Sequence, residues 1–151
     1  MRKRTWFGVQ AVIEIRGRSL HRAGIGRILI PHPPLVNYLL RFHLPDEPYR
    51  RLSILHEFGH FQVAPLVFIY ALIMALFLLT RPYVSLPELV VLLISIHAAW
   101  EMLAEGYVRL QTGTRYSQYY RSVPPVPRII FWIMMAGLTA LGWIILWSVR
   151  V

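Results

Sequence analysis

Residues 49–80, YRRLSILHEFGHFQVAPLVFIYALIMALFLLT, join a polar motif to a long apolar run. The last 18 residues of this stretch contain no ionisable side chain except that of Tyr70. A run of this length is close to the lower limit for a helix that crosses a bilayer, about 17 residues. Pro45-Asp46-Glu47-Pro48, just upstream, is typical of a helix start, since acids there face the positive end of the helix dipole. We therefore expect one helix, kinked at Pro65, that carries the motif and then crosses a membrane.

Two later segments also predict membrane helices. Leu89 to Trp100 is apolar apart from a serine and a histidine, and the pattern continues to about Leu110. It predicts a long helix over 87–110 whose second half leaves the lipid or faces protein. Residues 129–149 contain no charge and three tryptophans, which is the strongest such signal in the chain. Only 15% of all residues are charged, against about 25% in soluble domains. The sequence predicts a mainly α integral membrane protein with three transmembrane helices.

The basic residues indicate how these helices are oriented. Ten of the 16 Lys and Arg residues lie between Arg2 and Arg51, before the first span, and four lie between residues 109 and 128. Only Arg81 and Arg150 lie at the opposite ends of the spans. By the positive-inside rule, the N-terminal part and the loop before the third span are predicted to be cytoplasmic, in a protein of the cell membrane. Topology then explains the net charge of +9, so we expect a lipid bilayer and no nucleic acid as a partner.

A small α+β portion is expected before the first span. Residues 9–16 alternate between apolar and polar side chains, as in a half-buried strand. Gly24-Ile25-Gly26 indicates a turn, and Arg27-Ile28-Leu29-Ile30 predicts a second short strand that ends at Pro31. Residues 35–42 are compatible with a short helix. We expect one domain with five parts, namely the cytoplasmic strand and helix portion (1–48), the motif helix that runs into the first span (49–80), the second span (87–110), a cytoplasmic loop (111–128) and the third span (129–149).

The motif His56-Glu57-Phe58-Gly59-His60 fits the pattern H-E-x-x-H. On a helix, positions i and i+4 share one face, so both imidazoles can reach one metal ion. Glu57 stands between them, where it can act as a general base toward water activated by the metal. The chain has no cysteine, so only His, Asp and Glu can bind a metal. The competing interpretation is a histidine pair on an exposed helix face, which the apolar surroundings disfavour.

A catalytic zinc site needs a third protein ligand and an open position. The second membrane helix carries three candidates, His97, Glu101 and Glu105, which share one face at a spacing of four residues. An antiparallel hairpin that turns near Tyr83-Val84 places Glu101 and Glu105 within about one to two turns of His60, and His97 one turn deeper. The residues alone leave the third ligand open among these three.

The segment Glu101-Met-Leu-Ala-Glu105-Gly-Tyr107, followed by Gly113, resembles the second motif of gluzincin peptidases. It is most similar to the membrane family that contains the CAAX prenyl proteases and the bacterial heat-shock membrane proteases, which reads roughly Glu-x-x-Ala-Asp-x-Tyr-Ala. The resemblance covers about residues 26–113 and implies that Glu101 is the third zinc ligand. It also implies that Glu105, where the family has Asp, orients a ligand histidine, and that Arg27-Ile28-Leu29-Ile30 is an edge strand that pairs with the substrate.

On this basis we predict a zinc-dependent membrane metalloendopeptidase, far shorter than most relatives, with zincin-like active-site helices at the cytoplasmic membrane boundary. His56, His60 and Glu101 would bind Zn²⁺, and Glu57 would accept a proton from water and return it to the leaving amine. The substrate would be a protein or peptide segment close to the membrane. The sequence leaves the oligomeric state open.

Some residues and functions keep a second interpretation. His97 is interpreted first as a contact between helices and second as part of the site. Arg115 and Tyr116 either stabilise the oxyanion of the reaction or anchor their loop at the membrane surface. A non-catalytic membrane scaffold with a structural or vestigial zinc site is the main alternative, and a zinc hydrolase for another bond is a further one. No role is predicted for His21, His32 and His43.

Overall fold

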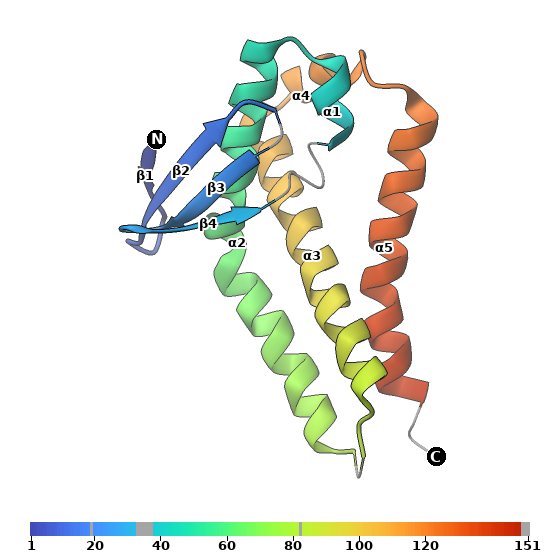
Figure 1. Ribbon diagram of the computed structural model, residues 1–151. Coiled ribbons are helices and arrows are strands. Elements are labelled where there is room, and N and C mark those ends of the chain that lie inside the picture. Colours follow the sequence, from blue (N-terminus) through green and yellow to red (C-terminus); the bar gives the residue numbers. More distant parts are fainter. Residues whose placement is uncertain (19, 33–37, 82, 149–151) are drawn as a thin grey trace.

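A computed structural model of the chain describes residues 1–18, 20–32, 38–81 and 83–148. The described chain is mainly helical, with a small antiparallel sheet at its N-terminal end (Figure 1). The four strands are β1 (Arg2–Arg4), β2 (Gln10–Arg16), β3 (Leu20–Ile25) and β4 (Ile28–His32). The five helices are α1 (Tyr38–His43), α2 (Asp46–Leu79), α3 (Leu86–Thr112), α4 (Arg115–Tyr120) and α5 (Pro125–Ser148).

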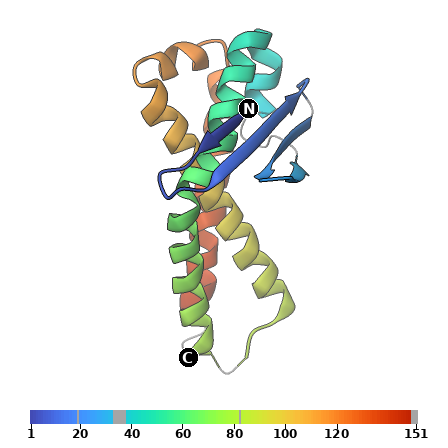
Figure 2. The same ribbon diagram turned by 90° about the vertical axis from the view of Figure 1, so that its left-hand side faces the viewer.

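The helices α2, α3 and α5 run side by side along the length of the molecule, and α3 packs against both others (Figures 1 and 2). Each is long and apolar enough to cross a membrane, which confirms the three helices expected from the apolar runs. Large apolar side chains such as Leu66, Phe68 and Ile133 are more than half exposed along their outer surfaces. Lipid is the solvent that such surfaces suit, since water would penalise them.

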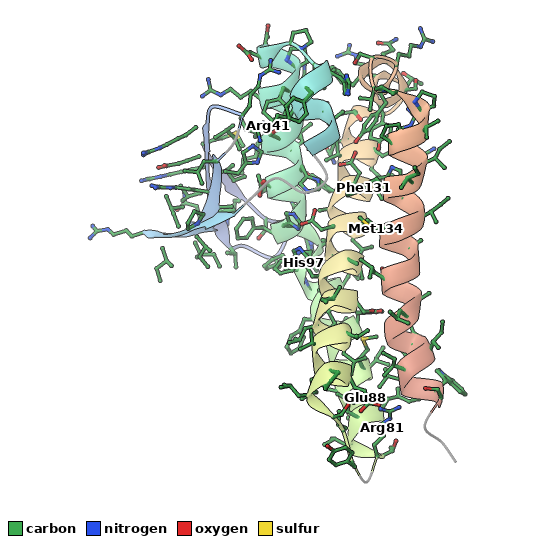
Figure 3. The ribbon with its side chains drawn as sticks, turned by 45° about the vertical axis from the view of Figure 1, so that its right-hand side comes forward. Arg41, Arg81, Glu88, His97, Phe131 and Met134 are labelled. Atoms are coloured by element: carbon green, nitrogen blue, oxygen red, sulfur yellow. The ribbon has the colours of Figure 1, made fainter. Side chains whose placement is uncertain are left out.

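Local sequence explains where the second of these helices begins. Ser85 Oγ accepts a hydrogen bond from the Glu88 backbone N–H, and Glu88 Oε2 accepts one from the Ser85 N–H at 2.7 Å. This capping box satisfies N–H groups that the first helical turn leaves free. At the same end of the bundle, Arg81 pairs with Glu88 at 3.2 Å and also donates to the carbonyl of Ile145, which joins all three helices there (Figure 3).

The helices differ from the sequence prediction at two places. The segment 111–128, expected to be a loop, contains α4, and α5 begins at Pro125 rather than at residue 129. Proline is favoured in the first turn of a helix, where its missing N–H costs nothing. Tyr120 and Val123 of this segment are buried against α1 and α2, and this packing orders it. Residue 149, the predicted end of the third span, lies outside the described residues.

The sheet has the strand order β1-β2-β3-β4, with all neighbours antiparallel. Ala11 and Ile13 of β2 are buried against Phe58 of α2, so the sheet lies across the motif-bearing half of that helix (Figure 2). Residues directly opposite each other in the ladder share a face. Ala23 and Ile30, which are paired through Ile13–Ala23 and Ala23–Ile30, therefore lie on the same side of the sheet as the residues that contact α2.

The sequence prediction of the sheet was incomplete. It missed β1 and β3, and it assigned Gly24-Ile25-Gly26 to a turn that in fact lies at Gly26-Arg27, where Gly26 has a φ of 62°. Gly24 is inside β3, and a Cβ there would lie 1.7 Å from the carbonyl oxygen of Ile28, so close packing of β4 explains this glycine. The second predicted strand begins one residue later, at Ile28, and continues through Pro31. Proline is tolerated because β4 is an edge strand.

The other predicted elements agree with the structure within a few residues. β2 begins at Gln10, one residue after the predicted start of that strand. The predicted short helix over 35–42 corresponds to α1, Tyr38–His43, and residues 35–37 of the prediction lie outside the described part of the chain. The helix that carries the motif is continuous from Asp46 through Pro65 to Leu79.

Candidate metal centre

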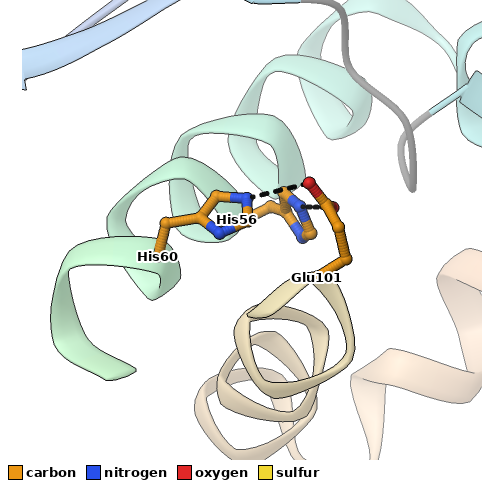
Figure 4. A group of neighbouring side chains, drawn as sticks. All are labelled: His56, His60 and Glu101. Carbon is orange, nitrogen blue, oxygen red and sulfur yellow. Dashed lines mark hydrogen bonds and ion pairs between the residues drawn. The ribbon is translucent and has the colours of Figure 1, made fainter. Parts of the chain in front are cut away.

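Three side chains from two helices meet where α2 and α3 pack closely together. One ligand atom from each of His56, His60 and Glu101 lies within 4.8 Å of the others (Figure 4). His56 Nε2 is 3.1 Å from Glu101 Oε2, and His60 Nε2 is 3.6 Å from Glu101 Oε1. Two imidazole nitrogens and one carboxylate oxygen form a donor set that zinc takes in catalytic sites. The residues therefore fit a zinc ion both by chemistry and by distance.

Small residues allow this approach of the helices. Gly59, inside the motif, faces Ala104, and a Cβ at residue 59 would lie 2.8 Å from the Ala104 carbonyl oxygen. The Trp100 indole N–H donates to the carbonyl of His60 at 2.9 Å and fixes the relative height of the two helices. Ala104 thus lies about one turn closer to the start of α2 than a hairpin centred at Tyr83-Val84 predicts.

Glu105 contacts the opposite ring nitrogen of His56. Its Oε2 lies 3.1 Å from His56 Nδ1, while its Oε1 accepts hydrogen bonds from the hydroxyls of Tyr116, at 2.8 Å, and of Tyr120. Burial and the Glu105 carboxylate both raise the pKa of the two tyrosines, so both hydroxyls stay protonated as donors at neutral pH. A carboxylate on the second nitrogen is the usual way to orient a histidine that binds a metal.

Glu57 is 1% exposed and is held from the side of the sheet. Its Oε1 lies 2.8 Å from Nδ1 of His21, a fully buried residue of β3. His21 Nε2 is 3.1 Å from the hydroxyl of Tyr49, which donates to the carbonyl of Arg18. The motif glutamate is therefore the first member of a buried polar chain that links α2 to β3, and such a chain limits its rotamers.

No role was predicted for His21, because strand β3 was not predicted. A signal for the strand was present, since His21, Ala23 and Ile25 alternate with polar or small residues. Pairing this stretch with residues 11–15, as the structure does, places His21 beside Ile15 on the face that covers α2. Only that pairing shows that the histidine reaches the motif, 36 residues later in the chain.

A pocket of about 530 Å³ opens beside these residues. Glu57, His60 and Glu101 line one side of it, and Ile25, Ile28 and Ile30 of the overhanging strands line the other. Nearly all of its exposed lining is apolar, and β4, at the edge of the sheet, forms its outer wall. The site therefore combines a buried polar centre with an accessible apolar groove.

The remaining predicted site residues lie at different distances from this centre. His97 is 53% exposed at the pocket, with Nε2 3.6 Å from Glu101 Oε1 (Figure 3). The Tyr116 hydroxyl donates a hydrogen bond to Glu105. Arg115 lines a separate pocket near Lys3 and Arg50. Of the predicted substrate strand, only Ile28 and Ile30 line the pocket beside the metal ligands, because Leu29 is on the opposite face and Arg27 is in the turn.

Comparison with known proteins does not add to this picture. No protein-family model, curated protein or solved structure matches the chain. The function must therefore be argued from the site itself.

Proposed function

We propose that this chain is a zinc-dependent membrane metalloendopeptidase, a minimal relative of the membrane gluzincins, with its active site on the cytoplasmic side of the cell membrane. The observation that carries the proposal is the meeting of His56, His60 and Glu101 within the range of one ion. The motif glutamate, Glu57, lines the adjoining pocket. This constellation supplies metal ligands, a general base and access for a substrate.

The proposed roles follow from the contacts of each side chain. His56, His60 and Glu101 hold the ion, and zinc when bound supplies a Lewis acid that polarises a carbonyl and activates water. Glu57 accepts a proton from the attacking water and delivers it to the leaving amine. His21 keeps the Glu57 carboxylate in place, and Glu105 keeps the His56 ring in place.

The shape of the pocket supports a peptide substrate. An extended chain can add to a sheet edge through backbone hydrogen bonds, and β4 is the last strand in the order of the described sheet, beside the candidate metal ligands. The side chains of Ile28 and Ile30 project into the pocket from this strand, so apolar substrate residues suit the groove. We propose that the substrate is a protein segment close to the membrane.

The experiment that tests this function compares wild type with Glu57→Gln in reconstituted membranes. Cleavage of membrane-protein substrates and bound zinc are measured on the same preparations. We expect the variant to retain zinc and to lose cleavage, because the amide cannot accept the proton. Glu14→Gln, at a half-buried glutamate of β2, is the matched control and should cleave like wild type. Equal cleavage by Glu57→Gln would refute the assigned base.

The alternative is a membrane scaffold with a structural zinc site. Structural zinc sites are closed by a fourth protein ligand. Among the residues that the structure describes, the group within ligand distance has three members and adjoins a pocket, which favours the enzyme. Zinc binding by wild type and Glu57→Gln alike, with no cleavage by either, would favour the scaffold.

A further inference from the structure

One end of the sheet carries large apolar side chains in its turns. The β1–β2 turn contains Trp6 and Phe7, and the β3–β4 turn is flanked by Ile25 and Ile28. Because Ala11 pairs with Ile25 and Arg4 pairs with Gln10, both turns lie at the same end of the sheet. Trp6 is 73% exposed and Ile28 is 74% exposed. Hairpin turns that face water are usually polar, so we infer that the apolar side chains at this end of the sheet contact an apolar partner.

The height of these turns along α2 identifies that neighbour. The backbone N–H of Trp6 donates to Gln62 Oε1 at 3.2 Å, and its indole N–H donates to the Gln62 carbonyl at 3.0 Å. Gln62 precedes Leu79, the end of α2, by 17 residues, a helical rise of about 25 Å. The hydrocarbon core of a bilayer is about 30 Å thick. When the end of α2 lies at one border of this core, Gln62 and the two turns lie close to the other border.

The surface of α2 changes character at the same height. Just beyond Gln62, Leu66 and Phe68 are 55% and 69% exposed, as expected for side chains in lipid. The two apolar turns, at the lower end of the sheet in Figure 1, therefore lie close to the level at which the exposed apolar surface of α2 begins. Tryptophan is enriched at this level in membrane proteins, because its ring is apolar and its N–H is polar.

The charged residues of the sheet also differ between its two ends. Exposed Arg4 precedes the β1–β2 turn and exposed Arg27 lies in the β3–β4 turn, and the segments 4–9 and 25–28 contain no acidic residue. At the opposite end of the sheet, Arg16 pairs with Glu14 and Arg18 pairs with Asp46. Arginines with no acidic residue in the same turn segment suit the anionic lipids of a cytoplasmic leaflet.

We propose that the two hairpin turns dip into the headgroup and upper acyl region of the cytoplasmic leaflet and bind anionic lipid there. This inference rests on the membrane orientation in the proposed function, and it does not require the chain to be a peptidase. It places β4 and the mouth of the metal pocket at the lipid surface. Substrates would then reach the site from the membrane plane rather than from the cytosol.

The absence of cysteine in the chain allows a direct test with single labels. Four variants of the full chain, Phe7→Cys, Ile28→Cys, Arg16→Cys and Leu76→Cys, are labelled with an environment-sensitive fluorophore. Each is reconstituted into vesicles of phosphatidylcholine with phosphatidylserine. Quenching by spin-labelled lipid and by aqueous iodide is measured at each position. Position 16 is exposed at the opposite end of the sheet, and position 76 lies on the lipid-facing surface of α2.

We expect lipid to quench the labels at positions 7 and 28 severalfold more than the label at position 16, and iodide to show the reverse order. Omitting phosphatidylserine should reduce lipid quenching at position 28 and leave position 76 unchanged. Iodide quenching at both turns equal to that at position 16 would overturn the proposal. So would shielding from both quenchers, which indicates a protein contact. Loss of lipid quenching at position 76 would instead refute the membrane spans themselves.

Discussion

The carboxylate of Glu57 is positioned by a residue from a different part of the fold. His21 lies 2.8 Å from it and is itself held 3.1 Å from the hydroxyl of Tyr49. Both partners are buried, so water cannot replace either contact without opening the sheet. At the scale of single residues, the candidate base therefore depends on β3 as much as on its own helix.

Replacement of His21 should show this dependence. We expect His21→Ala to lower the rate of cleavage about 10- to 100-fold, as supporting contacts of metal sites typically do, while zinc stays bound to His56, His60 and Glu101. His21→Gln, which can still donate to the carboxylate, should recover part of the rate. The exposed His43→Ala is the control. A rate for His21→Ala equal to that of the control would show that the contact does not position the base.

Glu105 offers a second residue-level prediction, on metal affinity. Glu105→Ala removes the partner of His56 Nδ1 and leaves the Tyr116 and Tyr120 hydroxyls without their acceptor. We expect zinc affinity, measured by competition with a chelator, to fall about 10- to 100-fold. Glu105→Asp should lose less, because a carboxylate remains. Tyr119→Phe, a neighbour that does not contact Glu105 in the described hydrogen bonds, should bind zinc like wild type.

At the scale of elements, the candidate metal centre depends on how closely α2 and α3 pack. The two imidazoles come from α2 and the carboxylates from α3. Gly59 lies between His56 and His60 in the sequence and faces the backbone of Ala104 in α3. Small residues at such crossings allow membrane helices to approach and gain dispersion contacts. Close helix packing therefore explains why residue 59 of the motif is a glycine, independently of zinc chemistry.

Substitution of this glycine should separate the helices. In Gly59→Ala the new Cβ meets the Ala104 carbonyl at 2.8 Å. We expect a loss of about 1–3 kcal/mol of stability, the range for overpacking, together with weaker zinc binding. Gly106→Ala, in the other helix, meets nothing within 4 Å and receives the same gain in helix propensity. Thermal unfolding of both variants in one detergent checks the difference, and identical midpoints would contradict the packing argument.

At the scale of the whole molecule, the charges divide the chain into two unlike ends. The end with the sheet, α1 and α4 carries most of the arginines, whereas Arg81 at the other end is paired with Glu88 (Figure 3). Lys and Arg are retained on the cytoplasmic side during insertion. The candidate metal centre lies in the half of the bundle that adjoins the basic end, which is the end that we propose to be cytoplasmic.

Thiol labelling in cells tests this orientation. Val84→Cys lies between α2 and α3, and Gln118→Cys lies in α4. We expect an impermeant maleimide to label position 84 in intact cells and position 118 only after permeabilisation, since the proposed orientation puts the two on opposite sides of the membrane. Labelling in the opposite order would reverse the topology and move the site to the outside.

The degree to which the chain could be predicted differs between its helices and its sheet. The three apolar helices were predicted to within a few residues because the length of an apolar run is a local property. β3 was missed because Gly24 looks like a turn residue, although it is a glycine that admits the backbone of β4. The structured segment 115–120 was missed because its tyrosines gain their order from distant partners in α1 and α2.

The sequence by itself determined three helices long and apolar enough to cross a membrane, and two histidines on one helix face, because run length and a period of 3.6 residues depend only on neighbours in the chain. Only the tertiary structure decided which later side chains meet those histidines and which residue holds Glu57. These contacts join residues 36 to 49 positions apart. They depend on the pairing register of β3 and on the close approach at Gly59, which no local pattern encodes.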